Sequence, residues 1–314
     1  MKVVVTGAGL AVPGADSVEL LRRAGPGSGP VDPAAVLGRR GLLYKDGATQ
    51  LALCAARGAL ADAGLLAADE LTVPGDEVAV VASSNLGNLD TVCRAAATIE
   101  ASGVGAVSPM DLPNASSNVV ASSVAIRFGL RGPNLMLCNG ATGGLDAVSF
   151  AVGLVRAGRA ARAVVVGVEP SNEIARQLTG CERLLDGAVA LVVEAASAAR
   201  ARGARQLAAI GGYARAADVV GCVDRLVDGG PAPGIWFVSE EADATPSPPA
   251  LADVPHCDLS AIHGRSSGAL GVLQCAAALA WLADGTVRRA LLTVGGARGE
   301  AAAALVLDAA GATP

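Results

Sequence analysis

Residues 135–147 read LMLCNGATGGLDA, and this stretch decides how the rest of the chain is interpreted. The apolar run from Leu135 to Cys138 predicts a short buried strand. Residues 139–144 are rich in glycine and predict a tight turn, after which a helical pattern continues to about Ala157. A strand, a tight turn and a helix expose the residue at the tip of the turn at a helix N-terminus, where enzymes place nucleophiles. The tip here is Ala141, whose methyl group carries no chemistry.

The composition predicts one large or two small cores and no nucleic-acid site. Of the 314 residues 52% are hydrophobic and only 2% aromatic, so alanine, leucine and valine must fill the core. A net charge of −5 provides no basic surface for nucleic acid. No apolar run reaches the ~18 residues of a membrane span, and the first residues lack a signal-peptide pattern. We therefore expect a soluble, cytoplasmic protein that does not associate with a membrane.

The sequence contains no pattern for a metal ion or a cofactor. Seven cysteines form no Cys-x-x-Cys pair and there are only two histidines, so zinc-ligand spacing is absent. Most of the thiols are expected to be small buried hydrophobes. Gly7-x-Gly9 lacks the third glycine and the later acidic residue of a dinucleotide site. We expect no metal and no cofactor.

Strands and helices alternate along the chain in two halves. Apolar runs predict strands at 2–6, 77–82, 135–138, 163–168, 188–194, 207–213, 235–239, 290–294 and 303–307. Helical spacing is clearest at 46–63, 91–102 and 267–282. The small, basic run 195–205 marks a boundary, which predicts an N-terminal half at 1–197 and a C-terminal half at 205–314. Such alternation is typical of an α/β protein with helices packed on sheets.

Several motifs occur in an order typical of one enzyme family. They read GLRGPN at 129–134, GGLDA at 143–147, VVVGVE at 164–169, DGAVALVVE at 186–194, GRSSGALG at 264–271 and TVGGA at 293–297. Together they resemble the condensing enzymes of the thiolase fold, and among these the elongating β-ketoacyl synthases. The resemblance extends along most of the chain. It implies a thiolase-like layered αβαβα fold made of two similar halves.

The resemblance also implies four catalytic groups, and this chain lacks all of them. An active member uses a cysteine thiolate, two histidines and a supporting lysine. Fitting the motifs places the cysteine at Ala141, the first histidine at Glu241, the second at Arg265 and the lysine at Ser260. We therefore expect these positions to be degenerate and the chain to have no catalytic residues.

No neighbouring residue is expected to replace the missing groups. Cys138 should be a buried thiol within the strand, Thr142 has no nearby histidine, and His263 precedes the fitted position by two residues. Two of the substituted residues invite a hypothesis: Glu241 and Arg265 could form a charge-assisted bridge, within about 4 Å, that plugs the pocket. The alternative is that both are exposed polar residues on loops.

The resemblance implies a chain length factor, the catalytically inactive partner of a type II polyketide ketosynthase. Such a subunit forms a heterodimer through the strand before the elbow, here Leu135, Met136, Leu137 and Cys138. It helps to bound the tunnel for the growing chain, and the candidate wall residues are Met110, Leu112, Asn118 and Val119. Their small or flexible side chains favour a reduced or polyene chain. Acyl carrier protein is expected to dock mainly on the ketosynthase.

Two other functions remain open from the sequence. The chain could decarboxylate malonyl carrier protein for initiation, although the methyl group of Ala141 cannot stabilise an oxyanion as an amide would. It could instead be a homodimeric acyl-binding or scaffold protein without a ketosynthase. The arginines within 156–162 and 200–205 fit solvated helix ends, or a docking surface for an acidic carrier protein.

Overall fold

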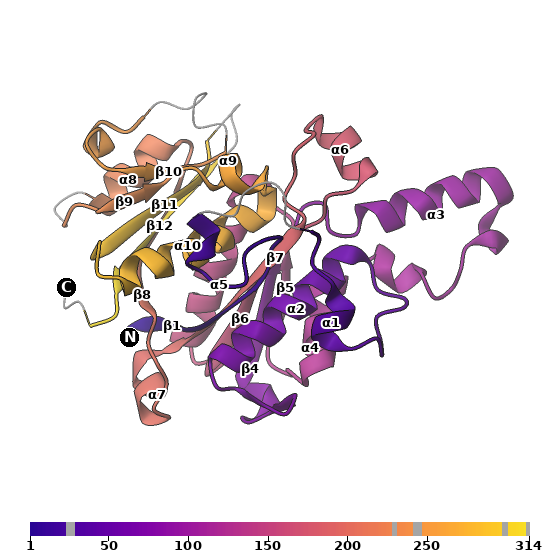
Figure 1. The fold of residues 1–314 in the computed structure, drawn as a ribbon, viewed down its shortest axis with the longest axis horizontal. Coiled ribbons are helices and arrows are strands. Elements are labelled where there is room, and N and C mark those ends of the chain that lie inside the picture. Colours follow the sequence, from indigo (N-terminus) through magenta and orange to yellow (C-terminus); the bar gives the residue numbers. More distant parts are fainter. Residues whose placement is uncertain (23–28, 228–230, 241–246, 297–300, 312–314) are drawn as a thin grey trace.

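The computed structural model describes residues 1–22, 29–227, 231–240, 247–296 and 301–311, and ten strands within them form one continuous sheet (Figure 1). The strands of the first half are β1 (Val3–Ala11), β4 (Val78–Ser83), β5 (Asn134–Leu137), β6 (Arg162–Glu169) and β7 (Gly187–Ala195). Those of the second half are β8 (Ala208–Ala216), β9 (Ile235–Phe237), β10 (His256–Cys257), β11 (Arg289–Gly295) and β12 (Ala302–Ala309). A separate small hairpin pairs β2 (Leu66–Ala67) with β3 (Glu70–Leu71).

The two halves of the sheet repeat one arrangement of strands. Neighbouring strands run β1-β7-β6-β4-β5 in the first half and β8-β12-β11-β9-β10 in the second. In each half the first two pairings are antiparallel and the last two are parallel. An antiparallel pairing of β1 with β8 joins the halves. The predicted α/β fold of two similar halves is confirmed, while the limits at 1–197 and 205–314 stay a prediction.

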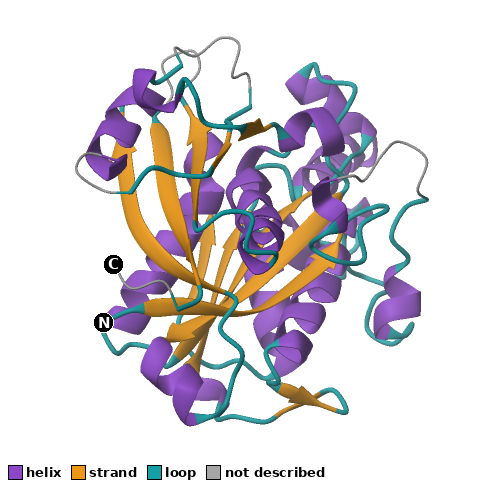
Figure 2. Ribbon diagram, turned by 60° about the vertical axis from the view of Figure 1, so that its left-hand side comes forward, coloured by secondary structure: helices purple, strands orange, loops and turns teal. Residues whose placement is uncertain are grey.

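Helices cover both faces of the sheet (Figure 2). In chain order they are α1 (Pro33–Leu37), α2 (Gly47–Asp62), α3 (Leu89–Ser102), α4 (Val119–Phe128), α5 (Gly143–Arg156), α6 (Glu173–Thr179), α7 (Ala196–Ala201), α8 (Val219–Val227), α9 (Leu259–His263) and α10 (Leu270–Ala283). Asp46 is the N-cap of α2, and its carboxylate accepts a hydrogen bond from the Thr49 amide. The helices expected at 46–63, 91–102 and 267–282 are therefore present as α2, α3 and α10, with limits close to the expected ones.

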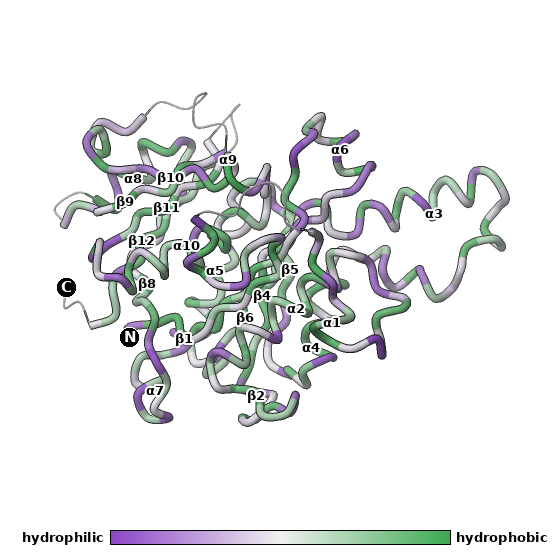
Figure 3. Tube along the Cα trace, viewed as in Figure 1, coloured by the Kyte–Doolittle hydropathy of each residue, from purple (hydrophilic) through white to green (hydrophobic). Residues whose placement is uncertain are grey.

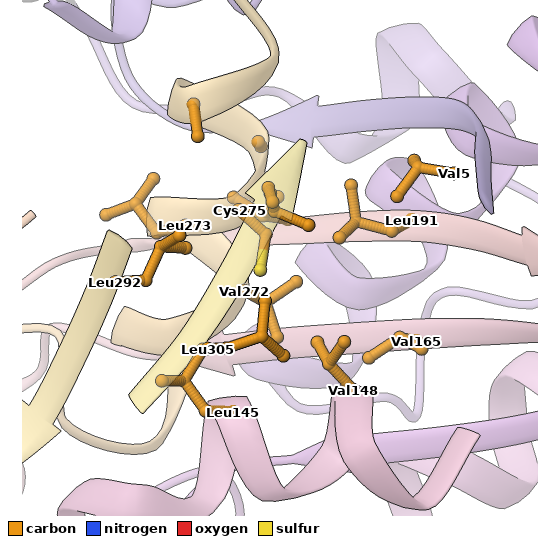
Figure 4. Close-up of a cluster of buried hydrophobic side chains, with 14 of the residues drawn as sticks. Val5, Leu145, Val148, Val165, Leu191, Val272, Leu273, Cys275, Leu292 and Leu305 are labelled. Carbon is orange, nitrogen blue, oxygen red and sulfur yellow. The ribbon is translucent and has the colours of Figure 1, made fainter. Parts of the chain in front are cut away.

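The central strands are buried on both faces and separate two hydrophobic cores. On β6, Ala163 and Val165 belong to a core with α5 and α10, whereas Val164 and Val166 belong to a core with α2 and α4. Figure 4 shows part of the first core, where side chains of β6, β7, α5 and α10 meet. Burial on both faces explains why such strands read as continuous valine-rich runs rather than as alternating patterns.

Hydrophobic residues are concentrated along the central strands and on α10 (Figure 3). None of the helices in the described ranges is long and apolar enough to cross a membrane. The motif Gly7-x-Gly9 lies on β1 against α2, where a Cβ at Gly9 would lie 2.1 Å from the Ala55 carbonyl oxygen. These glycines serve the close packing of a strand on a helix.

Helices α5 and α10 cross at a contact between two glycines. A Cβ built at Gly144 would lie 2.7 Å from the Gly271 nitrogen, and one at Gly271 would lie 2.4 Å from the Leu145 nitrogen. Backbone atoms fill the space on both sides, so neither position can accept a side chain without moving a helix. This contact sets the distance between the first turns of the two central helices.

The segment 89–118, which we call the arm, projects from the body of the protein (Figure 1). It comprises α3 and two short 3₁₀ turns, and Thr91 is the one buried residue of α3. The arm exposes large apolar side chains, with 74% of Val104, 54% of Met110 and 53% of Leu112 accessible. Because α3 buries so little, the arm gains little stability by packing on the described part of this chain. An isolated helix of this length is marginal in water.

The position of β5 corrects two expectations. Among the described strands β5 pairs with β4 alone and forms an edge of the sheet, so Leu135, Met136 and Leu137 are half-buried rather than buried. Cys138 follows the strand and is exposed, not the buried thiol that the apolar run suggested. An apolar run cannot distinguish an edge strand from a central one, because the difference depends on what lies beyond the strand.

The glycine contact gives a stability prediction. Gly144→Ala should lower the free energy of unfolding by about 1–3 kcal/mol, because the new methyl group meets the backbone of α10. Gly153→Ala is the matched control on the same helix, since a Cβ there meets nothing within 4 Å. The control should be neutral or more stable. Chemical denaturation of both variants measures this, and equal stabilities would contradict the proposed role of the contact.

Candidate functional site

The elbow lies between β5 and α5, as the sequence predicts. A 3₁₀ turn, Gly140–Thr142, connects them, and Gly140 has a φ of +80°, which favours glycine. Ala141 is half-buried at the tip. The backbone geometry that would present a nucleophile is therefore retained around a methyl group.

Glu169, at the end of β6, is the centre of the polar network beneath the elbow. One carboxylate oxygen accepts hydrogen bonds from the Asn85 amide at 2.7 Å and the Gly268 amide at 3.0 Å. The other accepts from the Leu86 amide at 3.0 Å and the Ser84 hydroxyl at 3.1 Å. Glu169 is 1% exposed and thus joins β6 to the loop after β4 and to the loop before α10.

Burial controls the protonation of Glu169. Desolvation raises the pKa of this carboxyl to about 7, although the hydrogen bonds from Asn85, Leu86, Ser84 and Gly268 oppose the shift. The four donors stabilise the charged form, whereas the loss of water stabilises the neutral form. Desolvation is the larger effect, so Glu169 titrates near neutral pH.

Asn85 connects this network to the elbow itself. Its side-chain amide donates to the Gly140 carbonyl at 3.0 Å and to the Ser267 hydroxyl at 2.8 Å, and its carbonyl accepts from the Gly140 amide at 3.2 Å. The Ser83 hydroxyl donates to the Gly268 carbonyl at 2.8 Å. The elbow and residues 264–271, which lie far apart in the sequence, are therefore held together by side chains of the β4 loop.

Arg265 forms an ion pair with Glu240, at 3.4 Å between Nε and Oε2. The other oxygen of Glu240 accepts hydrogen bonds from the amides of Ser266 and Ser267, the latter at 2.9 Å. The fitted position Glu241 lies outside the described residues. The Glu241–Arg265 bridge therefore stays a hypothesis, and the carboxylate that meets the guanidinium within the described residues is that of Glu240.

Thr142 and His263, which were also considered for chemistry, have structural partners. The Thr142 hydroxyl donates to Asp146 at 2.8 Å, and His263 makes a 2.8 Å hydrogen bond through Nε2 to the Leu21 carbonyl. Burial lowers the pKa of His263. Ser260, at the fitted lysine position, lies on α9, and its buried hydroxyl has no hydrogen-bond partner in the described part of the chain.

The remaining candidates are the thiol of Cys138 and a possible metal site. Partial burial of the thiol, and secondarily the Glu169 carboxylate, raise the pKa of Cys138, so its thiolate is disfavoured. Within the described ranges no three His, Cys, Asp or Glu side chains come together as a metal site. The arrangement can bind negatively charged groups through amides, but these residues supply no activated nucleophile.

A groove of about 440 Å³ runs along the outer face of α5. Its polar end is the buried carboxylate of Asp146, which accepts hydrogen bonds from Thr142, Asn139 and the Tyr213 hydroxyl. Arg215 lies 3.9 Å from the same carboxylate. Burial raises the pKa of Tyr213, and its hydrogen bond to Asp146 does so further. Sequence reasoning missed this cluster because its members come from separate elements.

The predicted tunnel residues fall into two groups. Met110, Leu112 and Asn118 are exposed on the arm. Val119 begins α4, is 8% exposed and packs into the core with α2. The first group is accessible to a partner, whereas a change at Val119 would disturb this chain's own packing.

Comparisons with known sequences agree with this architecture. The profile of the β-ketoacyl synthase N-terminal domain matches residues 37–185. The chain is 30% identical over 201 residues to granaticin polyketide β-ketoacyl synthase 1 of Streptomyces violaceoruber, covering 54% of this chain and 47% of that protein. It is 27% identical over 205 residues to 3-oxoacyl-(acyl-carrier-protein) synthase 2 of Vibrio harveyi, covering 57% and 49%. The chain thus spans about half the length of the curated relatives it matches.

Solved structures match over nearly the whole chain. The ishigamide ketosynthase/chain length factor is 26% identical with a TM-score of 0.77, covering 99% of this chain and 100% of that one. A type II polyketide synthase acyl carrier protein in complex with its ketosynthase bound to the hexaketide matches at 17% identity and a TM-score of 0.77, over 98% and 99%. A β-ketoacyl synthase from Burkholderia phymatum STM815 matches at 17% and 0.79, again over 98% and 99%. The last two show the thiolase-like fold alone.

The raised pKa of Glu169 predicts a pH-dependent stability. The folded-state pKa of about 7 exceeds the ordinary 4.5, so unfolding releases protons between these values. The stabilisation from Glu169 is fully present below pH 4.5 and is lost as the pH rises through 7. Relative to Glu169→Gln, the wild type should lose on the order of 3 kcal/mol of unfolding free energy across this window.

Denaturation between pH 4.5 and 8 measures this difference. Glu169→Gln should be less stable at every pH, because its amide group must face backbone donors, so the slope with pH is the diagnostic quantity. Glu100→Gln, an exposed substitution on the arm, is the control and should keep the wild-type slope. Parallel slopes for wild type and Glu169→Gln would show that Glu169 is ionised throughout.

Proposed function

We propose that this chain is a member of the β-ketoacyl synthase family and serves as a non-catalytic, chain length factor-type partner of an active ketosynthase. The observation that carries the proposal is the methyl group of Ala141 at the tip of an otherwise intact elbow. The surrounding donors are bound by carboxylates of this chain, Glu169 and Glu240. An elbow retained without its nucleophile suits a subunit whose contribution is shape.

The free edge of β5 supports a partner. The amides of Val80 in β4 and of Ser84, which follows β4, donate to the carbonyls of Pro133 and Leu137. The intervening Met136 therefore directs its own amide and carbonyl away from β4. An edge strand with unpaired backbone groups is a template for pairing with another strand. Under the proposal, Leu135, Met136, Leu137 and Cys138 form the interface with the ketosynthase.

The arm supplies the second part of the proposal. Its large apolar side chains, Met110 and Leu112 among them, are exposed, because the arm packs little against the rest of the described chain. Packed against a ketosynthase, they would be removed from water and could form one wall of its acyl tunnel. Met110, Leu112 and Asn118 remain the candidate wall residues, and a reduced or polyene chain remains the predicted product.

The similarity to the ishigamide ketosynthase/chain length factor, at 26% identity over 99% of this chain, supports the same role. The reaction itself would belong to the partner, a ketosynthase that takes its substrates from acyl carrier protein. Acyl carrier protein is accordingly expected to dock mainly on that partner. The present chain would fix the tunnel's length by its side chains rather than by chemistry.

Co-expression tests the function. Produced alone, the chain should be insoluble or unstable, and it should be recovered as a heterodimer with a ketosynthase encoded near it. Met136→Pro removes the outward amide and should abolish recovery, whereas the control Met136→Ile keeps the amide and should behave as wild type. A stable homodimer that ignores ketosynthase would favour a scaffold. Release of acetyl carrier protein from malonyl carrier protein by the isolated chain would favour an initiation decarboxylase.

Product length tests the tunnel assignment. In the co-expressed complex Met110→Trp should shorten the product, because a larger side chain would reduce the depth of the tunnel. Val36→Trp is the control, at a partly exposed apolar position on α1 outside the arm, and should leave the product unchanged. Mass spectrometry of the released chains gives the result. An intact complex with an unchanged product for Met110→Trp would reject Met110 as a wall residue.

A further inference from the structure

The outer face of α5 is apolar and lies uncovered in the described part of the chain. Phe150 is 55% exposed on this face, and Gly153, Leu154 and Ala157 line the same groove of about 440 Å³. A Cβ built at Gly153 meets nothing within 4 Å, so this part of the groove is open. A large aromatic side chain beside an open apolar groove is typical of a surface that another protein covers.

The groove continues the surface of β5 on one face of the sheet. Side chains alternate along a strand, and Leu135 and Leu137 pack against the core that contains α5, whereas Met136 packs against the opposite core. Asn139, two residues after the end of β5, lines the groove. A strand paired with the free edge of β5 would therefore present alternate side chains on the face that carries α5.

β5 alone is too small to hold a stable heterodimer. Its four residues extend over about 13 Å, whereas a stable interface takes roughly 20–30 residues from each partner. The arm supplies further area, and the groove supplies apolar area directly beside β5. A contact that begins at β5 would thus extend into the groove.

The polar end of the groove defines the chemistry of what covers it. Asp146 is only 4% exposed and is already satisfied by three donors, the side chains of Thr142, Asn139 and Tyr213. The Arg215 side chain is 49% exposed, and its guanidinium lies 3.9 Å from that carboxylate, beyond hydrogen-bonding distance. A covered guanidinium loses water and needs an acceptor. The covering segment should therefore combine apolar side chains with a carboxylate that meets Arg215.

We propose that the α5 groove is a docking site for an apolar segment of the ketosynthase that carries a carboxylate for Arg215. This inference rests on the proposed heterodimer and adds to it a second contact, beside β5. Phe150 is the anchor of that contact, because an exposed aromatic side chain loses a large apolar area to water when a partner covers it. Gly153 leaves the space in which a side chain of the partner inserts.

Variants of the groove in the co-expressed complex test the proposal. Phe150→Asp should weaken the heterodimer at least about tenfold, because it places an unpaired carboxylate in the covered groove. Leu20→Asp is the control, at a 39% exposed position on the 3₁₀ turn Leu20–Arg22 outside the groove, and should leave the dissociation constant unchanged. Sedimentation of the complex at decreasing concentrations gives the constants.

The polar end has its own pair of variants. Arg215→Met keeps a long side chain but removes the charge, so it should weaken the heterodimer by about fivefold or more. Arg156→Met, an exposed substitution on α5 that does not line the groove, is the control and should pair as wild type does. An unchanged dissociation constant for either Phe150→Asp or Arg215→Met overturns the proposal.

A photo-crosslinker covers the case in which Phe150→Asp does not fold. The amino acid p-benzoylphenylalanine in place of Phe150 keeps an aromatic side chain at this exposed position. Irradiation of the complex should join it to a ketosynthase peptide that contains an aspartate or glutamate, which mass spectrometry identifies. The same amino acid in place of Leu20 should give no such product. A crosslink to a second copy of this chain, or none to the ketosynthase within an intact heterodimer, would overturn the proposal.

These outcomes are separable from a failure of the proposed function. If the wild-type chain forms no heterodimer with the ketosynthase, the proposed function is wrong and the docking site falls with it. If the wild type forms the heterodimer while the groove variants pair equally well, the docking site alone is wrong.

Discussion

The contact between Gly144 and Gly271 is the constraint on which the site depends. Because neither helix carries a side chain there, the first turns of α5 and α10 approach to backbone distance. That approach brings the elbow of the first half next to the loop 264–271 of the second half. Asn85 can then bond to both loops at once, and Glu169 joins the loop after β4 to the loop before α10. A methyl group at either glycine would separate the helices and break the network that the loops share.

The network around the elbow holds the backbone of the turn in place. Hydrogen bonds from Asn85 fix the backbone of the turn, yet the residue that the turn presents is Ala141. Carboxylates of the chain itself occupy the amides before α10. The positively polarised helix N-terminus, which enzymes use to stabilise anions, is in this chain satisfied from within. These hydrogen bonds position the neighbouring elements, and the residue at the tip of the elbow presents a methyl group.

Two features of the fold leave apolar surface or backbone groups without partners in the described chain. β5 is the last strand of the sheet, and its outer edge is unpaired. In α3, the helix of the arm, Thr91 is the one buried residue. Both would cost free energy in an isolated chain, since ordered segments lose conformational entropy that only burial and hydrogen bonding can offset. The site itself is internally complete, whereas the surface beside it is not. A partner that covers this surface would offset that cost.

The sequence by itself determined the features that depend on neighbours along the chain. Valine-rich runs gave the central strands, and the glycine-rich turn after Leu137 gave the elbow and its tip at Ala141. Tertiary structure alone decided the rest. Cys138 is exposed because strand order places β5 at an edge, and no local pattern encodes strand order. Glu240 meets Arg265 although the two residues lie far apart in the sequence, because the packing of the second half brings their loops together. Contacts between distant segments depend on packing geometry to within an ångström, and sequence spacing does not fix that geometry.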